Sequence, residues 1–465
     1  MFNEKDIDLF TIDVSSFEYS KNVESHLMKA KLLPINGISQ GVINMLEVNK
    51  YHSGQKIPFG VASIKKEQVH LLINCVKKVS LLDFKLRNGF KKLFTSNPLE
   101  AAILLRRALN FFDGENLYVE KLIETLSKKP ELCLCTTALY RVDGLNGGDK
   151  IVINELNANP IGGLWLGTLA LEIGELKNSF GIRNVLGIIT KKIDDYTKNG
   201  GAYFHPVRTL DGPSSYSEKF ILREHFKTEG KKFFMGQLDS LILKKDGVFV
   251  KWQNKNYKID YIGGLSSPEV FERKPDILNY VADGKVNCPS IINNIIGLCN
   301  KAMFTLITDM REKLIDPAQL EFTEEDLYSN NPIPKTYWLL SKNNIDRTAL
   351  FKNTNMVAKP VDGVGANGIF FSKDHEIIEK FEGKLKLRYL IQDYYNPVQI
   401  KSNHSSITHG SIDPYFTFDG EKGIISGVLV RSAKQGLFPS LTANSKLCTK
   451  ENKDPGYLFS VGVIS

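Results

Sequence analysis

The stretch KIVINELNANPIGGLWLG, residues 150–167, runs from an apolar segment into a group of polar side chains. Residues 151–154 have the pattern of a short buried strand. Glu155, Asn157 and Asn159 follow at alternate positions, just before a proline and a glycine pair. Polar groups beside a buried strand are costly unless each one finds a hydrogen-bond partner or a ligand. The segment therefore indicates either a helix cap or a binding site.

A second acidic residue precedes this stretch by one turn. Asp143 lies in YRVDG, residues 140–144, twelve residues before Glu155, and the turn-forming sequence LNGGD lies between them. If the flanking strands pair antiparallel, both carboxylates lie near one edge of the sheet, with Asn157 on the same side. Two carboxylates and an amide oxygen are suitable ligands for Mg²⁺. Arg141 shares the face of Asp143, where it could clamp a phosphate.

A purely structural interpretation of these residues stays open. Asp143 could pair with Arg141 in a solvated turn. Glu155 and Asn157 could cap the following helix, because asparagine is a common cap residue.

The last third of the chain carries a glycine-rich loop between two expected strands. In NMVAKPVDGVGANGIFFSK, residues 355–373, Gly363, Gly365 and Gly368 match G-x-G-x-x-G. The dinucleotide-binding form of this motif needs a helix directly after the loop, whereas a strand is expected here. A glycine flap folded over the phosphates of ATP fits better. Lys359 ends the apolar run MVA, so we expect it to meet an anion unless its side chain snorkels outward.

The composition is that of a globular protein with a modest positive charge. The 465 residues are 42% hydrophobic and 24% charged, with a net charge of +8, and the lysines are scattered along the chain. Such a surface suits anionic ligands, nucleotides included, without indicating nucleic acid. No apolar run reaches the roughly 18 residues of a membrane span, and the N-terminus lacks the pattern of a signal peptide. We therefore expect a cytoplasmic protein with no nucleic-acid or membrane partner.

The six cysteines do not form a recognisable metal or disulfide pattern. None of them stands in a CxxC pair, and no paired histidine motif accompanies them. A zinc site or a disulfide framework is therefore not expected. Cys133 and Cys135 alternate within a segment that we expect to be a strand, which favours thiols packed in the core.

Four regions are predicted, in a mixed α/β fold. Residues 1–130 are expected to be mostly helical, with helices in 97–112 and 116–129. Residues 131–185 are expected to hold two strands, beginning at Leu132, and a helix at about 164–178. Residues 186–300 are expected to form an α/β unit, and residues 301–465 a β-rich half that carries the glycine flap.

Within the α/β unit, the sequence predicts a short strand, a helix and a hairpin. LGIIT, residues 186–190, is predicted to be a short buried strand, and a helix is predicted to end at Gly230. DSLILKKDGVFVKW, residues 239–252, is predicted to be a hairpin that turns at Asp246-Gly247. Residues 290–314 are predicted to be mostly helical.

Taken together, these motifs resemble the circularly permuted ATP-grasp ligases of the glutathionylspermidine synthetase group. RVD with ELN and NANP is similar to the R-x-D, E-x-N and P segment of that group, and MVAKPVDGVGANGIFF is similar to its phosphate flap. LIQDYY resembles the strand whose end meets adenine, and GVLVR and LTANS resemble C-terminal segments of the group. The E-x-N motif comes about 200 residues before the flap, as in the permuted order. The segment 186–262 is similar to the Rossmann-like pre-ATP-grasp domain of these ligases.

The resemblance implies ATP and Mg²⁺ as ligands and gives each motif residue a role. Metal contacts are implied for Asp143, Glu155 and Asn157, and catalytic contacts to the transferred phosphoryl group for Arg141, Lys359 and Arg431. Nucleotide contacts are implied for the flap and strand-end residues Lys359, Gly363, Gly365, Gly368, Gln392, Asp393, Tyr394 and Asn444. A second phosphate-binding lysine is expected before the flap, and Lys342 and Lys352 both remain candidates.

The implied activity is ATP-dependent ligation of a carboxylate to an amine through an acyl phosphate. The expected substrates are a small carboxylate, such as an amino acid or a peptide, and an amine acceptor. Two alternatives stay open, namely acyl transfer to the thiol of a carrier protein and a non-catalytic nucleotide-binding scaffold. The complete set of two acids and an amide argues against the scaffold, and the oligomeric state is not predicted.

Overall fold

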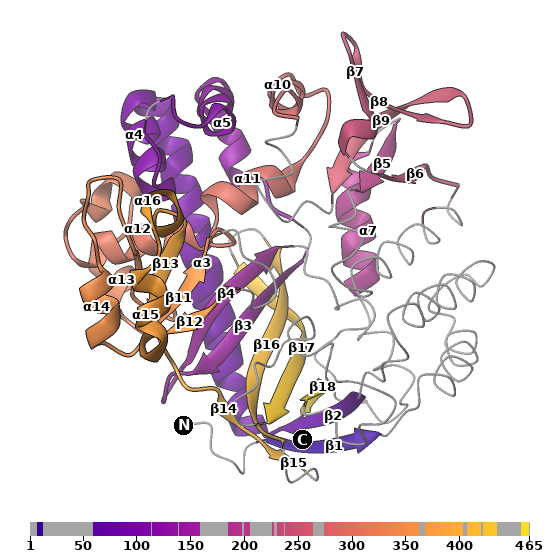
Figure 1. Ribbon diagram of the computed structural model, residues 1–465. Helices are drawn as coiled ribbons and strands as arrows, with labels where there is room; N and C mark the ends of the chain where they lie inside the picture. Colours follow the sequence, from indigo (N-terminus) through magenta and orange to yellow (C-terminus); the bar gives the residue numbers. More distant parts are fainter. Residues whose placement is uncertain are drawn as a thin grey trace.

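A computed structural model describes the fold of this chain. The residues that it describes are 7–12, 59–112, 114–137, 139–158, 185–197, 200–204, 226, 230–236, 238–263, 274–361, 368–402, 407–419, 422–434 and 457–464. The described elements form a mixed α/β fold with three sheets (Figure 1).

The largest sheet has nine strands, which come from both ends and the middle of the chain. Its strands follow the order β15-β1-β2-β18-β17-β16-β3-β4, and β14 pairs with β16 beside that path. β16 pairs antiparallel with both β17 and β3, so it lies at the centre of the candidate site. The strands are β1 (Ile7–Ile12), β2 (Phe59–Ile64), β3 (Tyr140–Asn146), β4 (Ile151–Ala158), β14 (Val398–Gln399), β15 (Lys401–Ser402), β16 (Ile407–Asp419), β17 (Lys422–Lys434) and β18 (Tyr457–Ile464).

A long helix, α3 (Lys66–Ser96), contacts β17, β16 and β4 of this sheet (Figure 1). Its apolar side is buried at positions that recur with helical spacing, among them Leu72, Val76 and Val79. This helix agrees with the prediction that residues 1–130 are mostly helical, although its bounds were not predicted, and the two strands β1 and β2 that precede it were not expected.

Two helices that follow α3 confirm the predictions for their segments. They are α4 (Pro98–Leu109) and α5 (Leu117–Lys128). Each begins after an asparagine cap whose side chain accepts backbone N–H bonds, and α4 has a proline in its first turn. The expected apolar face of α5 is buried in full, namely Val119, Leu122, Ile123 and Leu126.

The second sheet has four antiparallel strands and carries the lysine that precedes the glycine flap. Its order is β10 (Thr336–Trp338), β13 (Tyr389–Asp393), β11 (Met356–Pro360) and β12 (Phe370–Phe371). Leu339, Phe351, Met356, Ala358, Ile378, Tyr389 and Ile391 form a separate small core behind it. The helices of this unit are α14 (Thr348–Asn353), α15 (His375–Glu379) and α16 (Gly383–Lys386).

The third sheet lies apart from the other two, at the upper right of Figure 1. Its order is β6 (Phe233–Met235), β5 (Gly201–Phe204), β9 (Lys255–Gly263), β8 (Gly247–Trp252) and β7 (Leu241–Lys244). β5 is parallel to β6 and β9, and the helix α7 (Val185–Tyr196) precedes β5 in the chain, as expected of an α/β unit.

In this region and just before it, one predicted strand was wrong, the turn of a predicted hairpin is shifted by one residue, and another predicted strand begins later than expected. LGIIT lies in the first part of α7. A short apolar run alone does not distinguish a strand from a helix that continues beyond it. The β7–β8 hairpin exists, but Lys244 pairs with Gly247, so its turn residues are Lys245 and Asp246. Residues 130–134 form a 3-10 helix, η1 (Pro130–Leu134), and β3 begins only at Tyr140.

Cys133 packs in the core, as predicted, although it lies in a 3-10 helix and not in a strand. Cys133 is buried and Cys135 is half-buried, and the five cysteines in the described residues are free thiols. Burial raises the pKa of Cys75 to about 12, which makes its thiol a poor nucleophile.

Two helices, α11 (Pro289–Ile296) and α12 (Ala302–Arg311), confirm the prediction that residues 290–314 are mostly helical. The helix α10 (Ile277–Ala282) precedes them and α13 (Glu324–Tyr328) follows them. The remaining 3-10 segments are η3 (Leu238–Ser240), η4 (Pro317–Leu320) and η5 (Ser372–Asp374). Among the described helices, none has both the length and the hydropathy of a membrane span. The predicted helix at 164–178 and most of the one before Gly230 lie outside the described residues, and the division into four regions stays a prediction.

Candidate functional site

The two carboxylates of the opening motif face each other across a hairpin. β3 and β4 pair antiparallel, with Asp143 opposite Glu155 and Arg141 opposite Asn157. This confirms the strand pairing that was inferred from the twelve-residue spacing. Because the four residues sit at alternate positions of two paired strands, they share one face of the hairpin.

A β-bulge interrupts this hairpin directly beside the carboxylates. Asp143 pairs with Glu155, but the next residue, Gly144, pairs with Ile153. Asn154 is therefore the extra residue of β4, and a bulge of this kind re-aims a side chain. A Cβ atom on Gly144 would lie 2.4 Å from the Ile412 carbonyl oxygen of β16, so the close approach of the two strands requires glycine here.

Replacing Gly144 by alanine should therefore destabilise the hairpin. We expect the midpoint of thermal unfolding to fall, with a loss of about 1–3 kcal/mol in unfolding free energy from overpacking against backbone. Gly148→Ala in the same hairpin measures backbone strain alone, because its φ is +87° and an added Cβ meets nothing within 4 Å; that strain should cost about 1–2 kcal/mol. If Gly144→Ala unfolds at the wild-type temperature, the contact with Ile412 does not limit this site.

Asp143 is buried between two guanidinium groups. Arg141 donates from Nε to Oδ1 at 2.7 Å and from Nη2 to Oδ2 at 3.3 Å, and Arg431 Nη2 lies 2.8 Å from Oδ2. Burial raises the pKa of Asp143 to about 6, while the charges of Arg141 and Arg431 act in the opposite direction. The alternative of a solvated Arg141–Asp143 pair is thus half correct, since the pair forms but is not solvated.

Arg431 comes from β17 and joins the hairpin to the centre of the sheet. Its Nε donates to Asp413 of β16, which is fully buried. The same carboxylate accepts the Gly144 N–H at 3.2 Å and the Ser411 hydroxyl at 3.2 Å. Asp413 was not among the residues expected in the site, because no local motif marks it.

Glu155 meets a lysine that the sequence motifs did not identify. Lys301, the residue before α12, lies 3.1 Å from Glu155 Oε2, and Asn157 Nδ2 lies 3.4 Å from Oε1. Burial acts to raise the pKa of Glu155, but the charges of Lys301 and Lys359 outweigh it and hold the pKa well below its usual range. Glu155 is therefore ionised at neutral pH.

Lys359 links the second sheet to the bulge of the first. Its Nζ donates to the side-chain oxygen of Asn154, to the Asn154 carbonyl oxygen at 3.3 Å and to the side-chain oxygen of Gln392. With a relative exposure of 5%, Lys359 does not snorkel outward. Burial lowers its pKa to about 7, and the charge of Lys301 adds to this effect while Glu155 and Asp143 oppose it.

The strand end expected to meet adenine is ordered by neighbours on both sides. Gln392 is buried rather than solvated, and its Nε2 donates to the Thr336 hydroxyl at 3.3 Å. The Asp393 N–H donates to the Lys335 carbonyl, and the Tyr394 N–H to the Asn355 carbonyl. Burial raises the pKa of Asp393 and of Tyr394. An adenine contact for these three residues stays a prediction.

Several expected site residues lie away from this cluster or outside the described residues. Gly363, Gly365 and Asn444 lie outside the described residues. Gly368 is exposed with a φ of +73°, as a residue at the end of a glycine loop can be. The two candidate lysines pair elsewhere, Lys342 with Glu115 and Lys352 with Glu379.

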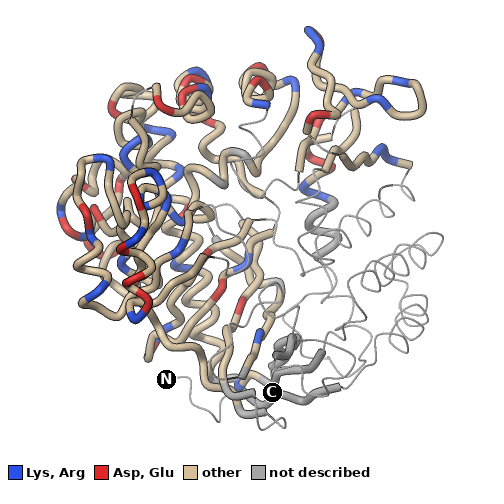
Figure 2. The backbone as a smooth tube through the Cα atoms, viewed as in Figure 1, with Lys and Arg blue, Asp and Glu red and all other residues tan. Residues whose placement is uncertain are grey.

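The contacts around Asp143, Glu155 and Asp413 form a charged network in which cations and carboxylates alternate. Figure 2 shows acidic and basic residues near one another on the central strands. Its cations are Arg141, Lys301, Lys359 and Arg431, and its carboxylates are Asp143, Glu155 and Asp413. Within the described residues, no three His, Cys, Asp or Glu side chains are grouped to hold a metal by themselves. The donors therefore fit Mg²⁺ only together with an anion such as a polyphosphate, which the four cations would receive.

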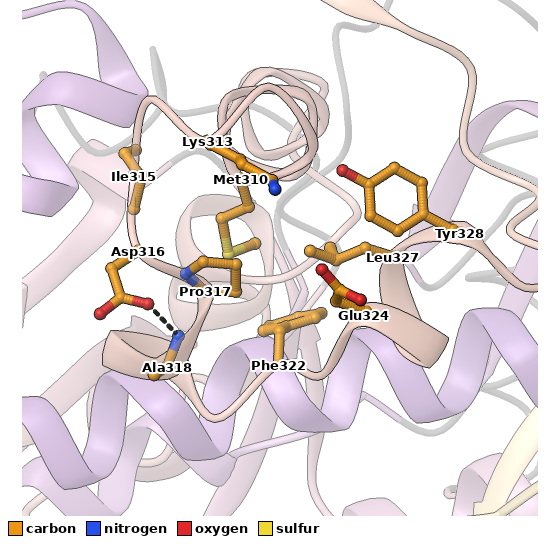
Figure 3. A pocket seen from close by; sticks show the side chains of 10 residues that line it. All are labelled: Met310, Lys313, Ile315, Asp316, Pro317, Ala318, Phe322, Glu324, Leu327 and Tyr328. Atoms are coloured by element: carbon orange, nitrogen blue, oxygen red, sulfur yellow. Dashed lines mark hydrogen bonds between the residues drawn. The ribbon is translucent and has the colours of Figure 1, made fainter.

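A surface pocket lies elsewhere, between the end of α12 and α13 (Figure 3). Its volume is about 440 Å³, and apolar side chains line it together with the charged residues Lys313, Asp316 and Glu324. The lining residues are Met310, Lys313, Ile315, Asp316, Pro317, Ala318, Phe322, Glu324, Leu327 and Tyr328. None of the candidate site residues lines it.

Comparisons with known proteins give distant likenesses only. No family model and no curated protein matches the chain. One similar solved structure is a glutathione synthetase-like effector from Globodera pallida in its apo form, with 10% identity, 98% of each chain covered and a TM-score of 0.49. Another is a candidate gamma-glutamylcysteine synthetase from Methylobacillus flagellatus KT, with 11% identity, 76% of this chain and 83% of that chain covered, and a TM-score of 0.36. At these values neither likeness assigns a function to this chain.

Proposed function

We propose that this protein is an ATP-dependent ligase that joins a carboxylate to an amine through an acyl phosphate. The observation that carries the proposal is the bond between Lys359 and Asn154, which are 205 residues apart. It brings the lysine of the glycine-flap strand onto the hairpin that presents Asp143 and Glu155. This contact supports a single site, at which the two motifs of opposite charge would bind Mg²⁺ and ATP together.

The order of these parts along the chain supports a circularly permuted ATP-grasp arrangement. The acidic hairpin, residues 140–158, precedes the flap strand β11, and the third sheet lies between them in sequence. In that sheet β5 is parallel to its neighbours, as in a Rossmann-like unit. The permutation and the Rossmann-like domain are part of the proposal.

In the proposed reaction, a substrate carboxylate oxygen attacks the γ-phosphorus of ATP. The bond to the β–γ bridging oxygen breaks, and ADP leaves with that oxygen. The amine nitrogen then attacks the acyl carbon, the carbon–oxygen bond to the phosphoryl group breaks, phosphate leaves and the amine loses a proton. Negative charge shifts among oxygens throughout, so positioned cations supply most of the catalysis.

Each described side chain has a place in this scheme. Asp143, Glu155 and Asn157 would hold Mg²⁺, which neutralises charge on the β- and γ-phosphates when bound. Arg431 and Arg141 would meet the transferred phosphoryl group from the same sheet. Lys359 would exchange its two amide oxygens for a phosphate oxygen, because a charged partner outcompetes neutral ones in a buried site.

Screening carboxylates and amines for ADP release tests the proposal most directly. Amino acids and short peptides are offered in pairs with ATP and Mg²⁺, and the product is identified by mass spectrometry. An amide product with stoichiometric ADP supports the ligase. A thioester on an added carrier protein would instead favour the thiol-acceptor alternative. Nucleotide binding without ADP release under any condition would favour the scaffold.

A further inference from the structure

We propose that Asp413 is a positioning residue for the phosphoryl-transfer site. No sequence motif assigns this role to it. The inference rests on the proposed function. Asp413 lies on β16, with an exposure of 0%, and contacts both sides of the cluster through its two oxygens. Oδ2 accepts from Arg431 Nε and from the Ser411 hydroxyl, and Oδ1 accepts from the Gly144 N–H.

The first contact fixes the direction of a guanidinium. The Nε of Arg431 donates to Asp413, and its Nη2 pairs with Asp143. Two of its three guanidinium nitrogens are therefore held by carboxylates on different strands. Within the described part of the chain, no hydrogen bond or ion pair engages its third nitrogen, Nη1. A planar guanidinium held at two corners keeps the third corner in one place, ready for an anion.

The second contact fixes the backbone beside Asp143. Gly144 pairs with Ile412, the neighbour of Asp413, and is also the residue at which the hairpin register shifts. The bond from its N–H to Asp413 therefore anchors the bulge on the β3 side. One carboxylate thus sets the position of Arg431 and that of Asp143, although it is not itself expected to touch a substrate.

This arrangement predicts an effect on turnover larger than its effect on nucleotide binding. In Asp413→Asn, the amide can still accept the Gly144 N–H, but it no longer carries the charge that holds Arg431. Because charge shifts onto the transferred group mainly in the transition state, we expect kcat to fall about 100-fold or more. The KM and Kd for ATP should change less than about 5-fold, since Lys359, the proposed ground-state contact to phosphate, is unchanged.

Asp83 offers a matched control. It is equally buried and accepts from Arg87 Nε at 2.9 Å and from the Leu298 N–H at 2.7 Å. Among the described residues, no hydrogen bond or ion pair joins it to the residues of the charged network. Asp83→Asn should lower the unfolding temperature while leaving kcat of the folded enzyme within about 3-fold of wild type. A purely structural role for Asp413 predicts that the two variants behave alike.

A double-mutant cycle tests whether Asp413 acts through Arg431. Adding Asp413→Asn to Arg431→Gln should cause no further loss of kcat, whereas independent roles would multiply the losses. This comparison also serves if Asp413→Asn alone does not fold, because the double variant removes the unpaired guanidinium. A further 10-fold loss in the double variant, or a folded Asp413→Asn with kcat near wild type, overturns the inference. A wild type that neither binds ATP nor releases ADP overturns the proposed function, and the inference with it.

Discussion

Replacing Glu155 by glutamine is expected to abolish ATP consumption while leaving the protein folded. The side chain keeps its shape, but its single oxygen can serve only one of the two donors Asn157 and Lys301, and the negative charge that would hold Mg²⁺ is lost. Loss of one charge-stabilising group in a dry site lowers kcat by about 100- to 1,000-fold. The measurement is ADP release with the substrate pair found in the screen, at several Mg²⁺ concentrations. Some recovery at high Mg²⁺ would point to weakened metal binding.

The control for this variant is Glu120→Gln. Glu120 has a side-chain exposure of 25%, against 28% for Glu155, and it also pairs with a cation, Arg106. We expect normal ADP release from it, and unfolding temperatures close to wild type for the folded forms of both variants. Turnover by Glu155→Gln that matches wild type at every Mg²⁺ concentration would show the metal assignment to be wrong.

Replacing Lys359 by methionine is expected to have opposite effects on function and stability. Binding of ATP should weaken by about 100-fold, because the charge-assisted bond to phosphate disappears. The unfolding free energy should rise by roughly 1 kcal/mol, because a buried cation with only amide and carbonyl partners is replaced by an apolar chain of similar length. Isothermal titration with ATP and denaturant unfolding measure the two effects.

The pH dependence gives Lys359 a distinct signature. Its pKa is about 7 in the folded protein, against a usual value of 10.5, so the folded state releases this proton at a pH where the unfolded chain keeps it. Unfolding then takes up a proton, and the contribution of Lys359 to stability improves as pH rises from about 7 towards 10.5. In the folded protein, the charge of Lys301 also lowers the pKa of Lys359, whereas the charges of Glu155 and Asp143 raise it. The stability gap between wild type and Lys359→Met should therefore narrow over this pH range.

Lys150→Met separates this behaviour from that of lysines in general. Lys150 donates to the Asn331 carbonyl at 2.8 Å, and burial lowers its pKa as well. It lies at the turn end of the same hairpin, before β4, and is not part of the charged network. Normal ATP affinity is expected for this variant. If Lys359→Met binds ATP as tightly as Lys150→Met does, the lysine of the flap strand does not contact phosphate.

The sequence alone was sufficient where the information is local. The thirteen residues from Asp143 to Glu155 contain parts of two short strands and a glycine turn, and such a segment has essentially one way to pair. The apolar run before Lys359 could only place that lysine in a core or at its edge, and a core position requires a partner. The helices α4 and α5 follow from caps and helical spacing in the same way.

Short apolar segments were less informative, because the same letters fit more than one local structure. LGIIT lies near the start of a helix whose later residues are mostly polar, and Cys133 lies in a 3-10 helix that starts at Pro130. In both cases the packing of neighbouring elements decided between local structures of similar intrinsic preference.

Only the tertiary structure could show what completes the site. Lys301 reaches Glu155, and Asp413 reaches Gly144, across 146 and 269 residues respectively, and neither stands in a recognisable motif. Asn154 was read as the last residue of a buried strand, yet one extra residue in β4 turns it towards Lys359. A motif specifies which groups are present, but the partners of a buried charge are chosen by strand order and by a one-residue shift in register. Those are set by the packing of the whole sheet.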